Sequence, residues 1–353
     1  MSKIRRIFAG SNTCQGLYSL HDNIIGENRN RLYILKGMPG GGKSSLMFRI
    51  GERALKEGFT IEYHHCPADP ESIDGVVINE LAIAIVDGTL PHPMDPVYPG
   101  LGDKIVNLAA YIDESKIDGA KDKIRNAKAN NKRAYERAFN YFKAAKNIYN
   151  EIIAMNKEYV DFKKVNKMSK KYLNKIFSHE IVEKENYKFK TRHMFSNAYT
   201  PKGYFDYTES IIEDVKNKYY LKGDLGTGKS KFMERAINKA NIEDFHLEIY
   251  YDPFVPDKIE SLLIHELDLI ISSNQKVKVG DYTTIDFNQY FDKSKVDNED
   301  YKEFKRLIKK GTEALNMAER NHFAQEEVYS EAIDFTGIDK EREKIWDEIK
   351  RYI

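Results

Sequence analysis

Two glycine-rich motifs of the same form occur in this chain, and they constrain its fold more than any other feature. Residues 37–44 read Gly-Met-Pro-Gly-Gly-Gly-Lys-Ser, and residues 223–230 read Gly-Asp-Leu-Gly-Thr-Gly-Lys-Ser. Both satisfy the phosphate-binding (Walker A) pattern of glycine, any four residues, glycine, lysine and then Ser or Thr. Glycines let successive backbone N–H groups turn toward phosphate oxygens, at the start of a helix whose dipole favours an anion. The sequence therefore predicts two nucleotide sites.

Each motif stands between an apolar run and a helical pattern. The runs at residues 32–36 and 219–222 predict buried strands, and apolar residues three and four positions apart predict a helix after each motif. Strand, loop and helix is the order that this kind of phosphate binding requires. The residues expected to bind the nucleotide are Gly37, Pro39, Gly40, Gly41, Gly42, Lys43, Ser44 and Ser45 in the first motif and Gly223, Leu225, Gly226, Thr227, Gly228, Lys229, Ser230 and Lys231 in the second.

The residue types in these motifs indicate ATP and Mg²⁺ as the cofactors. Lys43 and Lys229 would each bring a positive charge to the outer phosphates. The hydroxyls of Ser44 and Ser230 would coordinate magnesium. ATP is chosen because it is the common nucleotide for such loops, which contact the phosphates and not the base.

The two motifs belong to a duplication that runs along the whole chain. At a constant spacing of 186 positions, Lys43 matches Lys229 and Glu62 matches Glu248. The spacing is 187 upstream, and downstream it falls to 179 and then to 173. A tandem duplication of this kind predicts two related α/β domains, which together form an intramolecular pseudo-dimer.

The expected fold is two tandem P-loop NTPase domains, each a parallel sheet flanked by helices and followed by a helical, coiled-coil-like appendage. The boundary is placed in the polar stretch 178–192. The domain limits are residues 1–190, with a core of about 1–115 and an appendage of about 116–180, and residues 191–353, with a core of about 191–294 and an appendage of about 295–353.

Cysteine usage and hydropathy indicate a cytoplasmic protein. The 353 residues include 2 cysteines, too few for a disulfide framework, which fits a reducing compartment. No apolar run reaches the ~18 residues of a membrane span. Residues 1–7 also lack the apolar core of a signal peptide. We therefore expect a cytoplasmic location and no membrane partner.

The two copies differ in their acidic residues. In the first copy, residues 81–87 form an apolar run that ends in Asp87, as expected of a strand whose terminal carboxylate holds magnesium. Ser273 takes the matching position in the second copy, where seven residues are also missing. Asp252, at the end of another expected strand, is an alternative acid there. We therefore expect Lys43 and Asp87 to be catalytic and the second site to be degenerate or regulatory.

The segment 88–102 follows Asp87 and holds four prolines and three glycines. This composition predicts an ordered, irregular loop, at the sheet edge where open α/β folds bind ligands. Thr89, His92 and Asp95 are candidate contacts to a second substrate or an attacking water. The alternative is that Pro and Gly only shape the connection and that His92 is a surface residue.

His64, His65 and Cys66 are consecutive and raise the question of a zinc site. Adjacent residues of a strand point to opposite faces, and no spaced Cys or His pair completes a tetrahedral set. The favoured interpretation is a strand end that lines the pocket. Glu62 and Glu248 stay open, because each can be a structural partner or a general base.

A helical appendage follows each core. Apolar residues recur at steps of three and four between residues 117 and 159, which predicts one long helix or a hairpin that turns near residues 130–131. Residues 304–329 repeat the pattern in the second copy. We expect these apolar seams to pack on each other or on the sheets.

The first appendage is strongly basic. Residues 116–190 hold 17 Lys and 3 Arg against 9 acidic residues, although the whole chain has a net charge of +1. Such a basic arm raises nucleic acid as a partner. A solvated helical face is favoured instead, because the aromatic residues fall mostly on the apolar seam.

The paired motifs, the segment 65–75, and Asp87-Gly88-Thr89 with Pro91-His92 together resemble a family of uncharacterised bacterial tandem P-loop NTPases regarded as ATPases. The resemblance covers nearly the whole chain. It implies ATP binding through Lys43 and Ser44, and it brings no established substrate.

Three functions are carried forward as hypotheses. The favoured one is an ATPase with a working first site and a regulatory second site. The second is a kinase that phosphorylates a small molecule or nucleotide held by segment 88–102. The third is a non-catalytic, nucleotide-gated binding module that acts through its basic helical arms.

Overall fold

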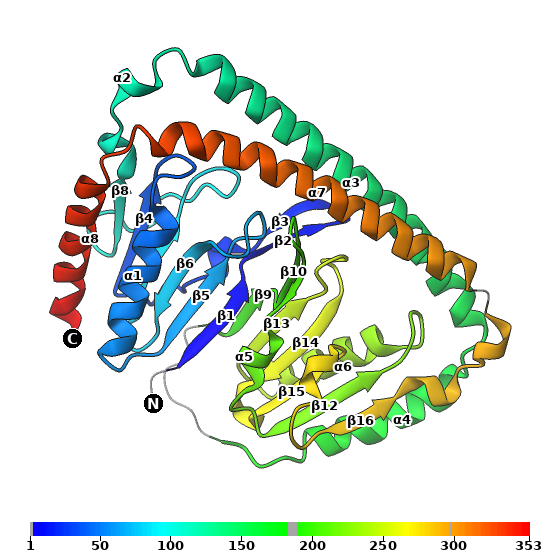
Figure 1. The fold of residues 1–353 in the computed structure, drawn as a ribbon. Helices are drawn as coiled ribbons and strands as arrows, with labels where there is room; N and C mark the ends of the chain where they lie inside the picture. Colours follow the sequence, from blue (N-terminus) through cyan, green and yellow to red (C-terminus); the bar gives the residue numbers. More distant parts are fainter. Residues whose placement is uncertain (1–2, 183–188, 297) are drawn as a thin grey trace.

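The computed structural model of the chain describes residues 3–182, 189–296 and 298–353. The described residues form an α/β protein with two six-stranded mixed sheets, one in each half, flanked by helices (Figure 1). This confirms the expected α/β class and the two repeated halves. The expected boundary stretch 178–192 includes residues 183–188, which lie outside the described residues.

The first sheet has the strand order β1-β5-β6-β7-β4-β8. A separate hairpin, β2-β3, follows its first strand. The elements are β1 Ile4–Phe8, β2 Gly10–Thr13, β3 Gly16–Ser19, η1 His21–Asn23, β4 Arg31–Lys36, α1 Lys43–Lys56, β5 Ile61–His65, β6 Ile73–Ile78, β7 Ile83–Asp87, β8 Asp103–Asn107, η2 Leu108–Tyr111, α2 Glu114–Ile117, α3 Lys121–Glu158 and α4 Phe162–Ile176.

The second sheet has the order β16-β12-β15-β14-β13-β9, and β10-β11 forms the matching hairpin. Its elements are β9 Thr191–Met194, β10 Asn197–Thr200, β11 Gly203–Asp206, α5 Thr208–Ile212, β12 Asn217–Lys222, α6 Lys229–Ile242, β13 Leu247–Tyr251, β14 Ile259–Ile264, η3 His265–Leu267, β15 Leu269–Ser272, η4 Gln275–Val277, β16 Thr283–Asp286, η5 Phe287–Tyr290, η6 Lys293–Lys295, α7 Glu299–Ser330, α8 Phe335–Ile349 and η7 Lys350–Tyr352.

The prediction of wholly parallel sheets is wrong at one strand of each half. β6 runs antiparallel to β5 and β7, and β14 runs antiparallel to β13 and β15. The reason is the length of the connections: residues 66–72 and 79–82 are too few for the crossover that parallel neighbours need. The strand before each glycine-rich loop, β4 or β12, is parallel to both of its neighbours in the sheet, as predicted.

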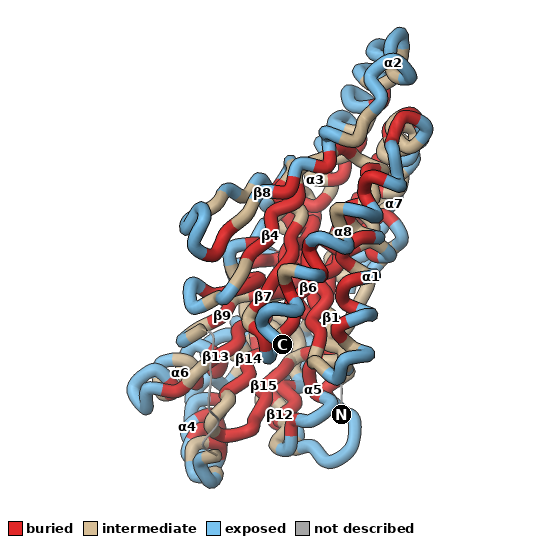
Figure 2. The backbone as a smooth tube through the Cα atoms, turned by 90° about the vertical axis from the view of Figure 1, so that its left-hand side faces the viewer, coloured by how far each residue is buried: buried red, intermediate tan, exposed pale blue. Residues whose placement is uncertain are grey.

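The two long helices, α3 and α7, lie side by side and antiparallel (Figure 1). The first appendage is thus one long helix, without a turn near residues 130–131. Phe142 of α3 is fully buried in the contact, next to Gly311 of α7. Buried residues are otherwise concentrated in the strands, whereas α2 and many loops are exposed (Figure 2).

The short helix at the end of each half packs on the sheet of the other half. Val165, Leu173 and Ile176 of α4 belong to the core of the second sheet. Ile345 and Trp346 of α8 belong to the core of the first sheet, where α8 lies beside α1 (Figure 1). The helices are therefore exchanged between the halves, as in a domain-swapped dimer within one chain.

The inner edges of the two sheets meet around a pseudo-twofold axis. Phe8 and Phe195, which are equivalent in the repeat, donate backbone hydrogen bonds to each other at 2.9 and 3.0 Å. Equivalent pairs of this kind around one point indicate that the halves associate as an isologous dimer does. In the described part of the chain, no helix is both long and apolar enough to cross a membrane.

The close approach of α3 and α7 generates a stability prediction. A glycine-to-alanine change inside a helix ordinarily stabilises it by ~1 kcal/mol. A Cβ atom on Gly311 would, however, lie 2.3 Å from a ring carbon of buried Phe142. We expect Gly311→Ala to lower the free energy of unfolding by about 1–3 kcal/mol, because the helices must separate.

Urea denaturation measures this change. Lys309→Ala, at an exposed position of α7, is the control and should change stability by less than ~0.5 kcal/mol. Phe142→Leu in the Gly311→Ala background should recover part of the loss. A Gly311→Ala protein as stable as the wild type would contradict this packing.

Candidate functional site

The first glycine-rich loop connects β4 to α1. Gly40 and Gly42 have φ values of 71° and 72°, in the left-handed region that favours glycine. Lys43 is the first residue of α1 and is 9% exposed. Backbone N–H groups at such a helix start can hold an anion.

Asp87, which the sequence places at the end of an apolar strand, lies beside Lys43. Asp87 ends β7, which pairs in parallel with β4, so that Asp87 is opposite Leu35. Its Oδ2 atom is 3.6 Å from Lys43 Nζ, which also donates to the carbonyl oxygen of Met38 at 2.8 Å. A lysine and a carboxylate thus face each other at the start of α1.

The serines of this loop have different surroundings. Ser44 Oγ accepts a hydrogen bond from the backbone N–H of Ile73 at 3.0 Å, whereas Ser45 is exposed. The other expected residues of the loop, Gly37, Pro39 and Gly41, lie between β4 and α1.

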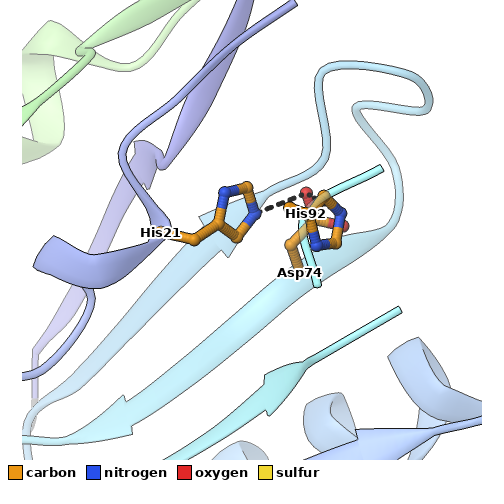
Figure 3. Close-up of side chains that lie close together, drawn as sticks. All are labelled: His21, Asp74 and His92. Carbon is orange, nitrogen blue, oxygen red and sulfur yellow. Dashed lines mark ion pairs between the residues drawn. The ribbon is translucent and has the colours of Figure 1, made fainter. Parts of the chain in front are cut away.

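The three candidate residues of segment 88–102 do not point to one place. Thr89 donates to Asp87 Oδ1 from its backbone N–H at 2.9 Å and from its hydroxyl at 2.6 Å. Asp95 pairs with Lys36 at 3.2 Å, and its side chain is 84% exposed. His92 is buried against His21 and Asp74 (Figure 3).

The second glycine-rich loop borders a cavity of about 420 Å³. Lys229, the first residue of α6, donates to the carbonyl oxygens of Gly223 and Asp224. Lys229, Ser230, Asp252 and Ser273 all line this cavity. The alternative acid Asp252 therefore lies in the same cavity as the lysine and serine of the motif.

The electrostatics of this cavity favour an anion near its lysines. Burial, followed by the nearby charge of Lys258, lowers the pKa of Lys229 to about 8. Burial also lowers the pKa of Lys258. Because two ammonium groups repel each other in partly buried surroundings, an anionic ligand would stabilise both.

The pKa of a carboxyl group in the same cavity is shifted in the opposite direction. Burial and then the negative charge of Asp252 raise the pKa of Glu260 to about 8. Its Oε2 atom accepts hydrogen bonds from the side-chain amides of Asn197 and Asn274, at 2.5 and 3.4 Å. Glu260 is therefore mainly protonated at neutral pH.

Each glycine-rich loop is covered by helices from the other half. A Cβ atom on Gly40 would lie 2.9 Å from the carbonyl oxygen of Glu326 in α7. The equivalent atom on Gly226 would lie 2.8 Å from the carbonyl oxygen of Ile153 in α3. Asn156 of α3 also donates to the carbonyl oxygen of Leu225 at 2.8 Å.

The sequence analysis did not predict these contacts between the helices of one half and the loop of the other. The repeat gave a usable signal, because Glu326 and Ile153 are equivalent at the spacing of 173. The pattern of apolar residues does not show which half a helix will cover. The equivalence of the two residues therefore did not identify the loop that each helix contacts.

Glu62 and Glu248 act as structural partners in this arrangement. Arg192 donates to Glu62 at 3.0 Å, and Arg5 donates to Glu248 at 3.1 Å, so that each pair joins the two halves. Although burial opposes ionisation, Arg192 holds the pKa of Glu62 well below its usual range. His64 contacts Glu62 at 2.9 Å, whereas His65 hydrogen-bonds to the carbonyl oxygen of Pro70.

No family model, curated protein or solved structure matches this chain.

The pKa of Glu260 leads to a pH prediction. The carboxyl of Glu260 is protonated in the folded state up to a pH of about 8, but in the unfolded state only up to about 4.5. The folded state therefore binds one more proton than the unfolded state in this pH range. As a result, the free energy of unfolding falls as the pH rises from about 4.5 to 8. Glu260→Gln, which cannot ionise, should be more stable than the wild type at pH 8, by at least ~1 kcal/mol.

Urea denaturation at pH 5 and pH 8 measures the difference. The advantage of Glu260→Gln should be small at pH 5 and grow toward pH 8. Glu243→Gln, at an exposed site just after α6, is the matched control and should show no such trend. A parallel pH dependence of Glu260→Gln and the wild type would rule out the raised pKa.

Proposed function

We propose that this chain is a tandem P-loop NTPase that binds ATP with Mg²⁺ at both glycine-rich loops and hydrolyses it at the first. The observation that carries the proposal is the pairing of Lys43 with Asp87. The lysine begins the helix after the glycine-rich loop, and the carboxylate ends the neighbouring parallel strand, 3.6 Å away. This is the arrangement of charges that phosphoryl transfer uses in P-loop proteins.

The residues around Lys43 fit a magnesium ion and phosphates. Ser44 supplies a hydroxyl and Asp87 a carboxylate, which are the hard oxygen ligands that Mg²⁺ prefers. Thr89 donates twice to Asp87 Oδ1 and so orients the Oδ2 atom toward Lys43. When bound, the ion would neutralise charge on the outer phosphates.

The protein's own groups then have separate tasks. Backbone N–H groups of the loop 37–44 would hold phosphate oxygens, and Lys43 would stabilise the charge that develops on the transferred phosphoryl group. Lys43 would release its contact with the Met38 carbonyl to reach that group. Asp87 and the Ser44 hydroxyl would hold the magnesium ion.

The second loop supports binding more than hydrolysis. Lys229 and Lys258 provide two cations with lowered pKa values in one cavity, and Ser230 offers a ligand for magnesium. Ser273, however, occupies the position equivalent to Asp87. We infer that nucleotide at this loop regulates the first site, with Asp252 as the nearest candidate acid.

The exchanged helices support communication between the two sites. α7 contacts the loop at Gly40, α3 contacts the loop at Gly226, and the two helices pack along each other. A movement of either loop would therefore displace a helix that belongs to the other half. This arrangement fits an intramolecular pseudo-dimer in which one nucleotide influences the other.

A nucleotide-gated binding module is the second candidate, and one observation favours it. The basic residues of α3 lie on its exposed face, including Lys121, Lys128, Lys132 and Arg133. These side chains form a cationic surface on the same helix that contacts the second loop. A kinase is less favoured, because Thr89, His92 and Asp95 do not face a common acceptor position.

The asymmetry between the loops can be tested by replacing each lysine. Lys43→Ala should reduce phosphate release from Mg·ATP by on the order of 100-fold or more, because it removes the charge next to the transferred group. Lys229→Ala should mainly alter nucleotide affinity or activation. Lys56→Ala, at the exposed end of α1, is the control and should retain the wild-type rate.

Steady-state phosphate release, with and without a pooled metabolite extract, distinguishes the functions. Equal loss of turnover in Lys43→Ala and Lys229→Ala would contradict the asymmetric model. Turnover that appears only with extract would indicate the kinase, and tight binding without turnover would indicate the binding module.

Asp87→Asn tests the proposed acid. The change keeps the side-chain size but removes the negative charge, so turnover should fall by on the order of 100-fold while part of the magnesium-dependent binding remains. Asp95→Asn, on the segment that follows Asp87 but exposed, should have little effect. An unchanged rate in Asp87→Asn would remove Asp87 from the mechanism.

A further inference from the structure

Three buried side chains of the first half have the composition of a metal site. His21 lies in η1, Asp74 in β6 and His92 in segment 88–102, and they come together as Figure 3 shows. They are 6%, 4% and 9% exposed, and one ligand atom of each lies within 4.8 Å of the others. We propose that this cluster binds a divalent transition-metal ion, and that zinc is the ion to test first.

The two distances from Asp74 match those between ligands of a shared ion. His21 Nε2 is 3.5 Å and His92 Nε2 is 3.6 Å from Asp74 Oδ2. Zinc bonds of ~2.0–2.1 Å place neighbouring ligand atoms of a tetrahedral site about 3.4 Å apart. A hydrogen bond between the same groups would be about 2.7–3.0 Å long.

The hydrogen bonds of the two histidines leave Nε2 available for coordination. The rings stack with their centroids 4.0 Å apart and 11° between their planes, so one ring must turn for both Nε2 atoms to share an ion. The Nδ1 atom of His92 is 3.1 Å from the carbonyl oxygen of Asp87, to which it can only donate, so the neutral ring has a free lone pair on Nε2. The Nδ1 atom of His21 is 2.8 Å from the hydroxyl of Ser19. A hydrogen-bond partner on the outer nitrogen is the usual arrangement for a metal-binding histidine.

Two atoms of the cluster also lack hydrogen-bond partners. His21 Nε2 and Asp74 Oδ2 are buried and make no hydrogen bond within the part of the chain that the structure describes. Leaving such groups unsatisfied costs ~1–3 kcal/mol each, and more for a charged group. A cation between them would satisfy both.

The equivalent position of the second half holds residues that are not a metal-binding set. In the repeat, Asp74 matches Glu260 and His21 matches Thr208. Glu260 accepts hydrogen bonds from Asn197 and Asn274, and Asn274 also donates to Thr208 at 3.0 Å. Neutral amides thus satisfy the carboxyl group there, and the Thr208 hydroxyl accepts from one of these amides. Two imidazoles surround the carboxylate in the first half instead.

The donor set defines the class of ion. Two imidazole nitrogens and one carboxylate oxygen suit Zn²⁺, Fe²⁺ or Co²⁺ better than Mg²⁺ or Ca²⁺, which prefer oxygen ligands. Three protein ligands are typical of zinc sites in which a water molecule or a substrate completes the coordination. The site is distinct from the proposed magnesium site at Ser44 and Asp87, although His92 hydrogen-bonds to the backbone of Asp87.

The first test measures metal content in the untagged chain, because a polyhistidine tag would bind the same ions. Protein stripped with a chelator is incubated with Zn²⁺ or Co²⁺ without nucleotide and desalted, and the bound metal is determined by mass spectrometry. We expect one ion per chain and, with Co²⁺, the visible absorption of a four- or five-coordinate ion. Stripped wild-type protein that retains no ion of either kind would overturn the proposal.

Variants locate the bound ion. His21→Asn and His92→Asn should each weaken zinc binding by on the order of 100-fold or more. His193→Asn is the matched control, because this histidine of the second half hydrogen-bonds to Tyr251 and lies outside the cluster. Zinc should also raise the Tm of stripped wild type, so the proposal stays testable if a variant fails to fold. Zinc binding by the His21→Asn/His92→Asn double variant that equals the wild type would overturn it.

Because no nucleotide is present, these results are independent of the proposed ATPase activity. A protein that binds zinc but does not hydrolyse ATP would support the metal site and contradict the proposed function. A protein that hydrolyses ATP but retains neither ion would do the reverse.

Discussion

The arrangement of this protein depends on two buried ion pairs that cross between its halves. Arg5 of the first half meets Glu248 of the second, and Arg192 of the second meets Glu62 of the first. These residues are equivalent in the repeat, so one interaction is made twice around the pseudo-twofold axis. Separating the halves would break both pairs, although Arg5 also contacts Glu62 of its own half at 3.3 Å. Breaking a buried pair costs ~3–5 kcal/mol. The relative position of the sheets is thereby fixed, which lets each long helix reach the opposite loop.

Local patterns in the sequence predicted the local structure well. The apolar runs before each motif are β4 and β12, and the helices after them are α1 and α6. Each of these elements is specified by residues only a few positions apart. The direction of β6 and β14 was missed because the hydropathy of a fully buried strand is the same in both directions. The short connections before and after them carried the missing information.

Features that join distant residues were harder to predict. The apolar seams of α3 and α7 indicated packing but not the identity of the partner, so the exchange of α4 and α8 was not foreseen. His21, Asp74 and His92 come from a 3-10 helix, a strand and a loop that are far apart in the sequence. No local spacing relates them, and only the folded sheet and its loops bring them together. The facing of Lys43 and Asp87 was predictable, because parallel neighbouring strands end at the same edge.

The exchanged helices have a consequence for how the chain folds during synthesis. The core of the first sheet includes Ile345 and Trp346, which the ribosome adds long after β8 has emerged. Until then the apolar face that α8 will cover stays accessible to water and to chaperones. α4, in contrast, is made before the sheet on which it will pack. The core of the first sheet therefore cannot close until the last helix is complete, whereas every buried residue of the second core has been made once Phe287 is added.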